Sequence, residues 1–235
     1  MSGKTTKLIF TDMKKIVFTL AVALIALHGT AQETNFSLRP AVKVEKSVTN
    51  KFSLQLAHQT RYYTDLNEFE RFSASLEGKY SLSKNWDAGL AYAWLYKHQI
   101  DDDFYASRNR YYLYLKYNHD VGDWSFSIRE KFQSTFYNKT LENPSYTPKN
   151  VLLTKVEVAY KIKPLALTPF VNGQLRYMVN HPNKNELNQY RWALGGKYKI
   201  NQLLGVSLFF EQRVDMNTSS PYKVNIIGAE LKIKI

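Results

Sequence analysis

The chain has 235 residues, 32 of them basic and 20 acidic, and a formal net charge of +12. It contains no cysteine, which excludes disulfides, a lipid-anchored cysteine and cysteine-ligated metals. Aromatic residues are abundant, with 17 Tyr, 13 Phe and 4 Trp, and Tyr and Trp favour boundaries between apolar and wet surroundings.

Residues 1–31 have the organisation of a secretory signal peptide. Two lysines precede the apolar run IVFTLAVALIAL at 16–27, and small residues follow at the −3 and −1 positions of a cleavage site. The run is shorter than the roughly 20 apolar residues of a membrane-spanning helix. Translation from Met13 would give a compact form of the same signal. We expect cleavage to leave one domain over 32–235, with 28 basic and 19 acidic residues and a net charge of +9.

The mature chain consists of segments in which apolar and polar residues alternate, separated by turn-forming residues. These segments exceed the roughly 5–6 residues of common globular strands and reach the roughly 9–11 that a tilted strand needs to cross a bilayer. The predicted strands, in chain order, are 36–45, 51–63, 71–82, 86–97, 108–118, 124–136, 151–162, 167–178, 188–200, 203–215 and 222–235.

The connections between these strands alternate between short and long. SVTN, LSKN, DVGD, KPLA and NQ form the short set, and the longer polar stretches are 64–70, 98–107, 137–149, 179–187 and 215–221. Short periplasmic turns and long extracellular loops are typical of outer-membrane barrels. The sequence therefore predicts an all-β, antiparallel transmembrane β-barrel of about 10–12 strands in the bacterial outer membrane.

The closure of the barrel is left open by the sequence, because single-chain bacterial barrels usually have an even number of strands. If the last strand ends in the periplasm, the first of eleven strands begins at the outer side. Three solutions remain: a twelfth strand near 32–40, an N-terminal segment inside the lumen, or parallel pairing of the first and last strands. Pro40 weakens the first predicted strand because proline lacks a ladder donor.

One face of the predicted strands is apolar, with aromatic residues toward the strand ends and aliphatic residues toward the middles, so we expect it to face lipid. Glu130 interrupts this face. Either a bulge turns it inward or it lies at an interface. The alternation also shifts at Ile226 and Ile227, which predicts a bulge in the last strand.

The segment RYYTDLNEFERFSASLEGKYSLSKNWDAGLAYAWLY, the signal ending in AQ and the C-terminal IIGAELKIKI resemble Bacteroidetes outer-membrane proteins of the domain of unknown function 2490 family. The resemblance covers the whole mature chain and rests on diffuse strand patterns. It implies the barrel fold and the outer membrane. It supplies no established activity and no catalytic residues.

The opposite face is strongly basic, with 14 basic and 4 acidic residues among the 18 charges placed there, so internal pairing cannot neutralise them all. Rings of Arg or Lys select anions in pores. Residues two apart share a face, and three such pairs recur near the outer ends of outward-running strands: Gln59 and Arg61, Gln174 and Arg176, and Glu211 and Arg213. The pore-lining candidates are Gln59, Arg61, Lys79, Lys97, Arg110, Lys116, Arg129, Lys131, Gln174, Arg176, Arg191, Lys197, Glu211 and Arg213.

Two functions fit this pattern. One is a narrow, porin-like channel with a basic, anion-favouring lumen, and the other is a structural or surface-binding barrel whose lumen is plugged by interlocking side chains. We expect outer-membrane lipid and lipopolysaccharide, the barrel-assembly machinery and small anionic solutes as partners. Nucleic acid is not expected, because the basic residues alternate along strands instead of forming an exposed stripe.

A lipid-modifying enzyme is the third and weakest interpretation. His58 falls on the lipid face, His98, His119 and His181 fall in predicted turns or loops, and no nucleophile motif accompanies them. No cofactor is implied. The acidic run 101–103 is expected to be a solvated loop, because it lacks the spaced oxygens and the glycine of a calcium loop.

Overall fold

The computed structural model describes residues 34–63, 69–99, 103–138, 147–217 and 223–235. The predicted signal peptide and its cleavage site lie outside these ranges. Residues Thr34–Ile235 form one compact unit. In the described ranges, no helix has the length and apolar character needed to cross a membrane.

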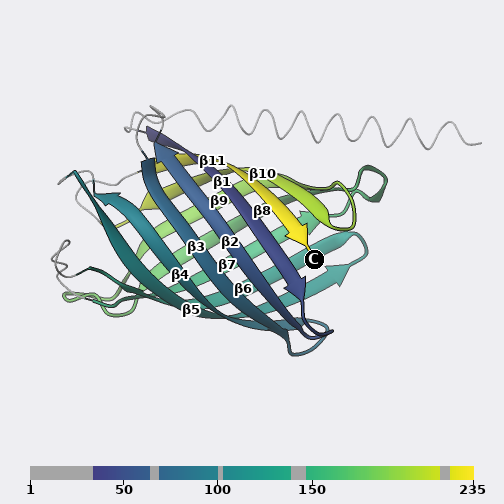
Figure 1. Cartoon of the computed structure of the whole chain (residues 1–235), viewed down its shortest axis with the longest axis horizontal. Coiled ribbons are helices and arrows are strands. Elements are labelled where there is room, and N and C mark those ends of the chain that lie inside the picture. Colours follow the sequence, from purple (N-terminus) through teal and green to yellow (C-terminus); the bar gives the residue numbers. More distant parts are fainter. Residues whose placement is uncertain (1–33, 64–68, 100–102, 139–146, 218–222) are drawn as a thin grey trace, which may run out of the picture. The chain divides into compact units, whose positions relative to one another are not determined.

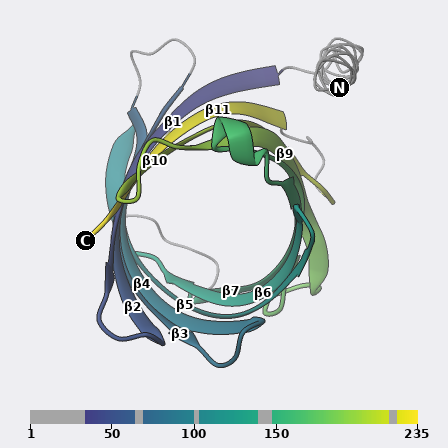
Figure 2. The ribbon, with the colours of Figure 1, turned by 90° about the vertical axis from the view of Figure 1, so that its right-hand side faces the viewer.

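In these described ranges, eleven strands close into a barrel, and each strand is tilted across it (Figures 1 and 2). All eleven predicted strands are confirmed, because the alternation that predicts them is a local property of each segment. The elements are β1 (Thr34–Ser47), β2 (Phe52–Tyr63), β3 (Phe69–Ser81), β4 (Trp86–Gln99), β5 (Phe104–Val121), β6 (Trp124–Phe136), β7 (Lys149–Tyr160), η1 (Lys163–Leu165), β8 (Leu167–Met178), β9 (Glu186–Lys199), β10 (Leu204–Asp215) and β11 (Lys223–Lys234).

The barrel closes through a parallel pair, while every other neighbouring pair is antiparallel. Strands β1 and β11 run side by side in the same direction (Figure 1), in register from Thr34 with Lys223 to Glu45 with Lys234. Parallel pairing of the first and last strands, one of the three predicted solutions, is therefore confirmed. On its other side β1 pairs with β2 at Leu38 and again from Ala41 onward, and Pro40 lies in the gap, as its missing N–H requires.

The two ends of the barrel differ in their connections. We call the end that carries the short connections 48–51, 82–85, 122–123, 161–166 and 200–203 the turn end, and the opposite end the loop end. In the tightest connection, between β5 and β6, Gly122 takes a positive φ of 60°, a conformation that glycine adopts without steric cost. The loop-end connections 137–148, 179–185 and 216–222 are longer than every turn-end connection, as predicted, whereas the stretch predicted as 98–107 is reduced to 100–103 because β4 and β5 extend into it.

The outward face of the barrel is apolar and exposed, as predicted. Leu90, near the middle of β4, is 65% exposed, while Trp86 and Tyr96 lie toward the two ends of the same face. Aromatic pairs join neighbouring strands near the ends, such as Trp124 with Tyr160, whose ring centroids are 5.0 Å apart. This is the profile of a lipid-facing band with aromatic girdles.

The bulge predicted at Ile226 and Ile227 is wrong. The β10–β11 ladder passes through both residues without a register shift, so the alternation continues. Ile227 is 54% exposed on the outer face, and Ile226 is fully buried inside the barrel. Register shifts occur instead at Arg61, between β2 and β3, and at Arg176, between β8 and β9.

Glu130 stays on the outer face. It pairs in register with Leu115 on β5 and Thr154 on β7, and neither ladder shifts there, so the predicted inward bulge is wrong. The residue is exposed at the centre of β6, between the exposed Ile128 and Phe132. A carboxylate thus lies in the middle of an otherwise apolar band.

We expect Glu130→Leu to raise the free energy of unfolding from lipid vesicles by about 1–2 kcal/mol, because a charged side chain near the midplane of the lipid face destabilises a barrel. Urea unfolding at pH 8 would measure the change. Glu130→Gln should give a smaller gain. A loss of stability in Glu130→Leu would show instead that the carboxylate contacts a partner.

Candidate functional site

The lumen holds a cavity of about 820 Å³ to which all eleven strands contribute. Eleven basic and six acidic side chains line it, so the cavity wall carries a surplus of basic residues. Nine of the fourteen candidate residues line this cavity: Gln59, Lys79, Lys116, Arg129, Lys131, Gln174, Arg191, Lys197 and Glu211.

The cavity occupies the turn-end part of the lumen and stops partway along the strands. It reaches Ala166 and Lys199 beside the turns. The three i, i+2 pairs mark its limit. Gln59, Gln174 and Glu211 line the cavity. Their partners Arg61, Arg176 and Arg213, which lie two residues closer to the loop end, do not line it.

Beyond this limit the lumen is filled by side chains. The inward positions continue the period-2 alternation of the cavity-lining residues, and many are almost inaccessible to water. We call this region the plug, and its most buried inward residues are Ser37, Arg61, Leu95, Ala106, Gln133, Thr135, Val151, Leu153, Met178, Gln189, Val224 and Ile226. The five remaining candidates lie at this level: Arg61, Lys97, Arg110, Arg176 and Arg213.

The plug is organised around a buried ion pair. The Arg61 Nη1 and Glu70 Oε1 atoms are 3.4 Å apart, and the two side chains are 2% and 6% exposed. Glu70 is the extra residue at the register shift, where Arg61 pairs with Arg71 and the next pair joins Tyr62 to Phe69. Glu70 also lies within electrostatic range of Arg71 and Lys97. One carboxylate therefore faces three cations.

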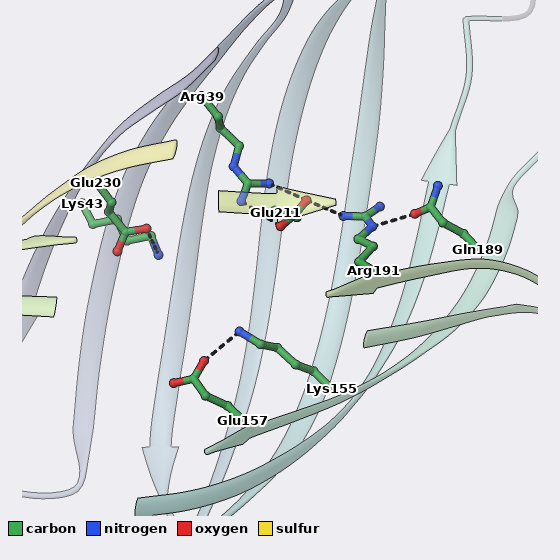
Figure 3. Close-up of polar contacts among 8 residues, drawn as sticks. All are labelled: Arg39, Lys43, Lys155, Glu157, Gln189, Arg191, Glu211 and Glu230. Carbon is green, nitrogen blue, oxygen red and sulfur yellow. Dashed lines mark hydrogen bonds and ion pairs between the residues drawn. The ribbon is translucent and has the colours of Figure 1, made fainter. Parts of the chain in front are cut away.

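Carboxylates that bridge two cations organise the cavity wall. Glu211 on β10 accepts two hydrogen bonds from Arg39 on β1, at 3.1 and 2.9 Å, and lies 4.0 Å from Arg191 on β9. Figure 3 shows this chain of contacts continuing from Arg191 to Gln189 at 2.6 Å. Two more carboxylates bridge two lysines: Glu45 contacts Lys79 at 3.1 Å and Lys232, and Glu157 contacts Lys155 at 3.0 Å and Lys197 at 2.5 Å. Glu230 forms an ion pair with Lys43 at 2.7 Å.

Glu77 is held differently, by two tyrosines of β5. The hydroxyl groups of Tyr112 and Tyr114 donate to its two oxygens at 2.9 and 2.8 Å. The Tyr114 ring lies directly against the backbone of Gly89 on β4, where an added Cβ would be 2.3 Å from a ring carbon. Glycine is therefore required at this position so that Tyr114 can lie flat and reach Glu77.

Several lumen residues were missed by the sequence analysis. Arg39, Lys43 and Glu45 line the cavity from β1, and their alternation with Leu38, Val42 and Val44 was a signal that could have found them. Glu70 had no such signal, because it belongs to the predicted loop 64–70 and turns toward Arg61 only through the register shift.

The histidines are placed partly against expectation. His98 and His119 lie in β4 and β5, so their prediction in turns or loops is wrong. The Nε2 atom of His98 is 3.0 Å from Asp103 Oδ1, and that of His58 is 2.9 Å from Thr60 Oγ1.

The acidic run 101–103 is described only at Asp103, and Asp101 and Asp102 lie outside the described residues. Within the described ranges, no group of three or more His, Asp or Glu side chains is arranged to hold a metal ion.

Solved structures with a similar fold are outer-membrane barrels. The β domain of the Bordetella autotransporter BrkA has a TM-score of 0.46 and 9% identity, over 76% of this chain and 82% of that chain. The outer-membrane expressed OmpT of Vibrio cholerae has a TM-score of 0.41 and 11% identity, over 71% of this chain and 52% of that chain. The anion-selective porin from Comamonas acidovorans has a TM-score of 0.39 and 8% identity, over 79% of this chain and 54% of that chain. The chain therefore spans about half the length of OmpT and of this porin.

The comparison with curated proteins gives no match. The family model of DUF2490, described as a protein of unknown function, matches residues 40–222, which is well over half of the chain. The barrel therefore belongs to the DUF2490 family of proteins of unknown function.

Proposed function

We propose that the protein, exported by a cleaved signal peptide, is a narrow outer-membrane channel that admits small anions from the periplasm into its basic cavity. In the state described, the plug closes the loop end. The observation that carries this proposal is the cavity itself, which has eleven basic against six acidic lining residues and stops at the same level on three strands. A surplus of positive side chains in a low-dielectric cleft raises the local concentration of anions.

The orientation follows from the connections. Outer-membrane barrels keep their short turns in the periplasm and their long loops outside, so the turn end is periplasmic. The cavity reaches the turn end at Lys199, and Arg61 and Glu70 lie between it and the exterior.

A structural or surface-binding barrel with a permanently closed lumen is the second candidate. The dense plug favours it, because side chains that fill a lumen at rest can also fill it permanently. The ring nitrogens of His58 and His98 contact Thr60 and Asp103, a pairing that does not point to an enzymatic role.

The absence of cysteine allows a direct test of anion entry. In proteoliposomes, Ser207→Cys in the cavity should react with an anionic thiol reagent about tenfold faster than with a cationic one, because the basic wall concentrates anions. Only reagent on the turn-end side should react. Thr135→Cys, in the plug, should react with neither.

Ser83→Cys, in the exposed turn 82–85, corrects for the intrinsic reactivity of the two reagents. Equal rates at Ser207→Cys after this correction, or faster reaction with the cationic reagent, would overturn the proposal of an anion-admitting cavity.

A further inference from the structure

Three cations on one wall of the cavity stand outside its ion-pair network. Lys116 on β5 and Arg129 and Lys131 on β6 all line the cavity, and in the described parts of the chain none has a carboxylate within ion-pair distance. Lys116 and Arg129 are direct cross-strand partners. Like charges in that position destabilise a sheet.

The nearby carboxylates are already occupied. Glu77 accepts hydrogen bonds from Tyr112 and Tyr114, and Glu157 is bridged by Lys155 and Lys197. The Asp87 oxygens accept from Ser81 at 2.8 Å and from Asn118 at 2.9 Å. These three acids therefore form no ion pair with the three cations, and on this wall five cations, counting Lys155 and Lys197, face three acids.

Aromatic rings fix two of these cations in place. The Lys131 Nζ atom lies 4.6 Å from the centroid of the Tyr112 ring, and the Arg129 Cζ atom lies 5.8 Å from that of Tyr114. Tyr114 is itself held against Gly89 and bonded to Glu77. Within the described chain, the buried Nε of Arg129 has no hydrogen-bond partner. Tyrosine rings thus lie against two of the three cations, and one Arg129 donor is unused.

We propose that Lys116, Arg129 and Lys131 form a binding site for a small multivalent anion of the diphosphate class. This inference rests on the proposed function, because the site opens into the anion-admitting cavity. Arg129 supplies a planar fork that fits two phosphoryl oxygens, and the lysines act as point charges. Lys131 lies two residues beyond Arg129, roughly 7 Å along the strand, so two linked phosphoryl groups span the cations better than one.

Calorimetric titration of the folded, detergent-solubilised protein with sodium pyrophosphate tests the site. We expect one pyrophosphate per chain, at least tenfold weaker binding of inorganic phosphate, and a rise in thermal stability on binding. The triple variant Lys116→Gln, Arg129→Gln, Lys131→Gln should bind pyrophosphate at least tenfold more weakly. Its fold should persist, because the substitutions remove like-charge repulsion, and heat-modifiable gel migration would verify this.

The matched control is Lys51→Gln, Lys84→Gln, Lys163→Gln, which removes the same charge from exposed turn-end positions that do not line the cavity. It should bind pyrophosphate within about twofold of the wild type. Equal losses in both variants would show only a general charge effect and would overturn the site. Tighter binding of citrate than of pyrophosphate would overturn the diphosphate assignment.

Failure of this inference is distinguishable from failure of the proposed function. If pyrophosphate does not bind while Ser207→Cys still reacts faster with the anionic reagent, the site is wrong and the anion-admitting cavity stands. If the anionic preference at Ser207→Cys is also absent, both fail.

Discussion

Glu70→Gln is expected to lower the free energy of unfolding by about 3–5 kcal/mol, the range for breaking a buried ion pair by removing one partner. Glu70 pairs with Arg61 and also faces Arg71 and Lys97, so its loss leaves three cations close together without their carboxylate. Arg61→Gln should cost clearly less, because Glu70 keeps Arg71 and Lys97 as counter-charges.

Urea unfolding from lipid vesicles would measure both single variants and the double variant. Because the residues are in contact, their effects should not be additive, and the double variant should be more stable than the sum of the single losses predicts. Equal losses in Glu70→Gln and Arg61→Gln would contradict the arrangement of one carboxylate among three cations.

Truncation of side chains in the plug should convert a barrel that carries little current into a conducting one. Gln133, Leu153 and Ile226 are almost fully buried and fill the lumen from β6, β7 and β11. Replacing all three by alanine removes side-chain volume between the cavity and the loop end. We expect at least tenfold more current through planar bilayers than the wild type carries, with a reversal potential in a KCl gradient that favours chloride, because the basic cavity remains intact.

A matched control truncates three outward residues, Leu115, Val156 and Leu208, to alanine. It removes comparable volume from the lipid face and should leave the barrel as silent as the wild type. If the plug variant folds, as shown by heat-modifiable gel migration, and remains silent, the permanently closed structural barrel becomes the better account of the molecule.

The candidate site could be predicted in part. The three i, i+2 pairs pointed to one level of the lumen, and the structure places the limit of the cavity there, between Gln59 and Arg61 on β2. The division into cavity and plug could not be predicted, because Arg61 and Gln59 carry the same alternation signal. Their different surroundings come from partners such as Glu70, which reaches the lumen only through a shift in strand pairing.

The sequence by itself determined the strands and their two faces. Alternation is read within one segment, and lipid and lumen select side chains of opposite polarity, so 124–136 and 167–178 were predicted with the observed bounds. Only the tertiary structure decided how β1 meets β11, that Ile226 turns inward, and which part of the lumen is filled. These features depend on register between distant segments and on side chains that converge from around the ring, which no local pattern encodes.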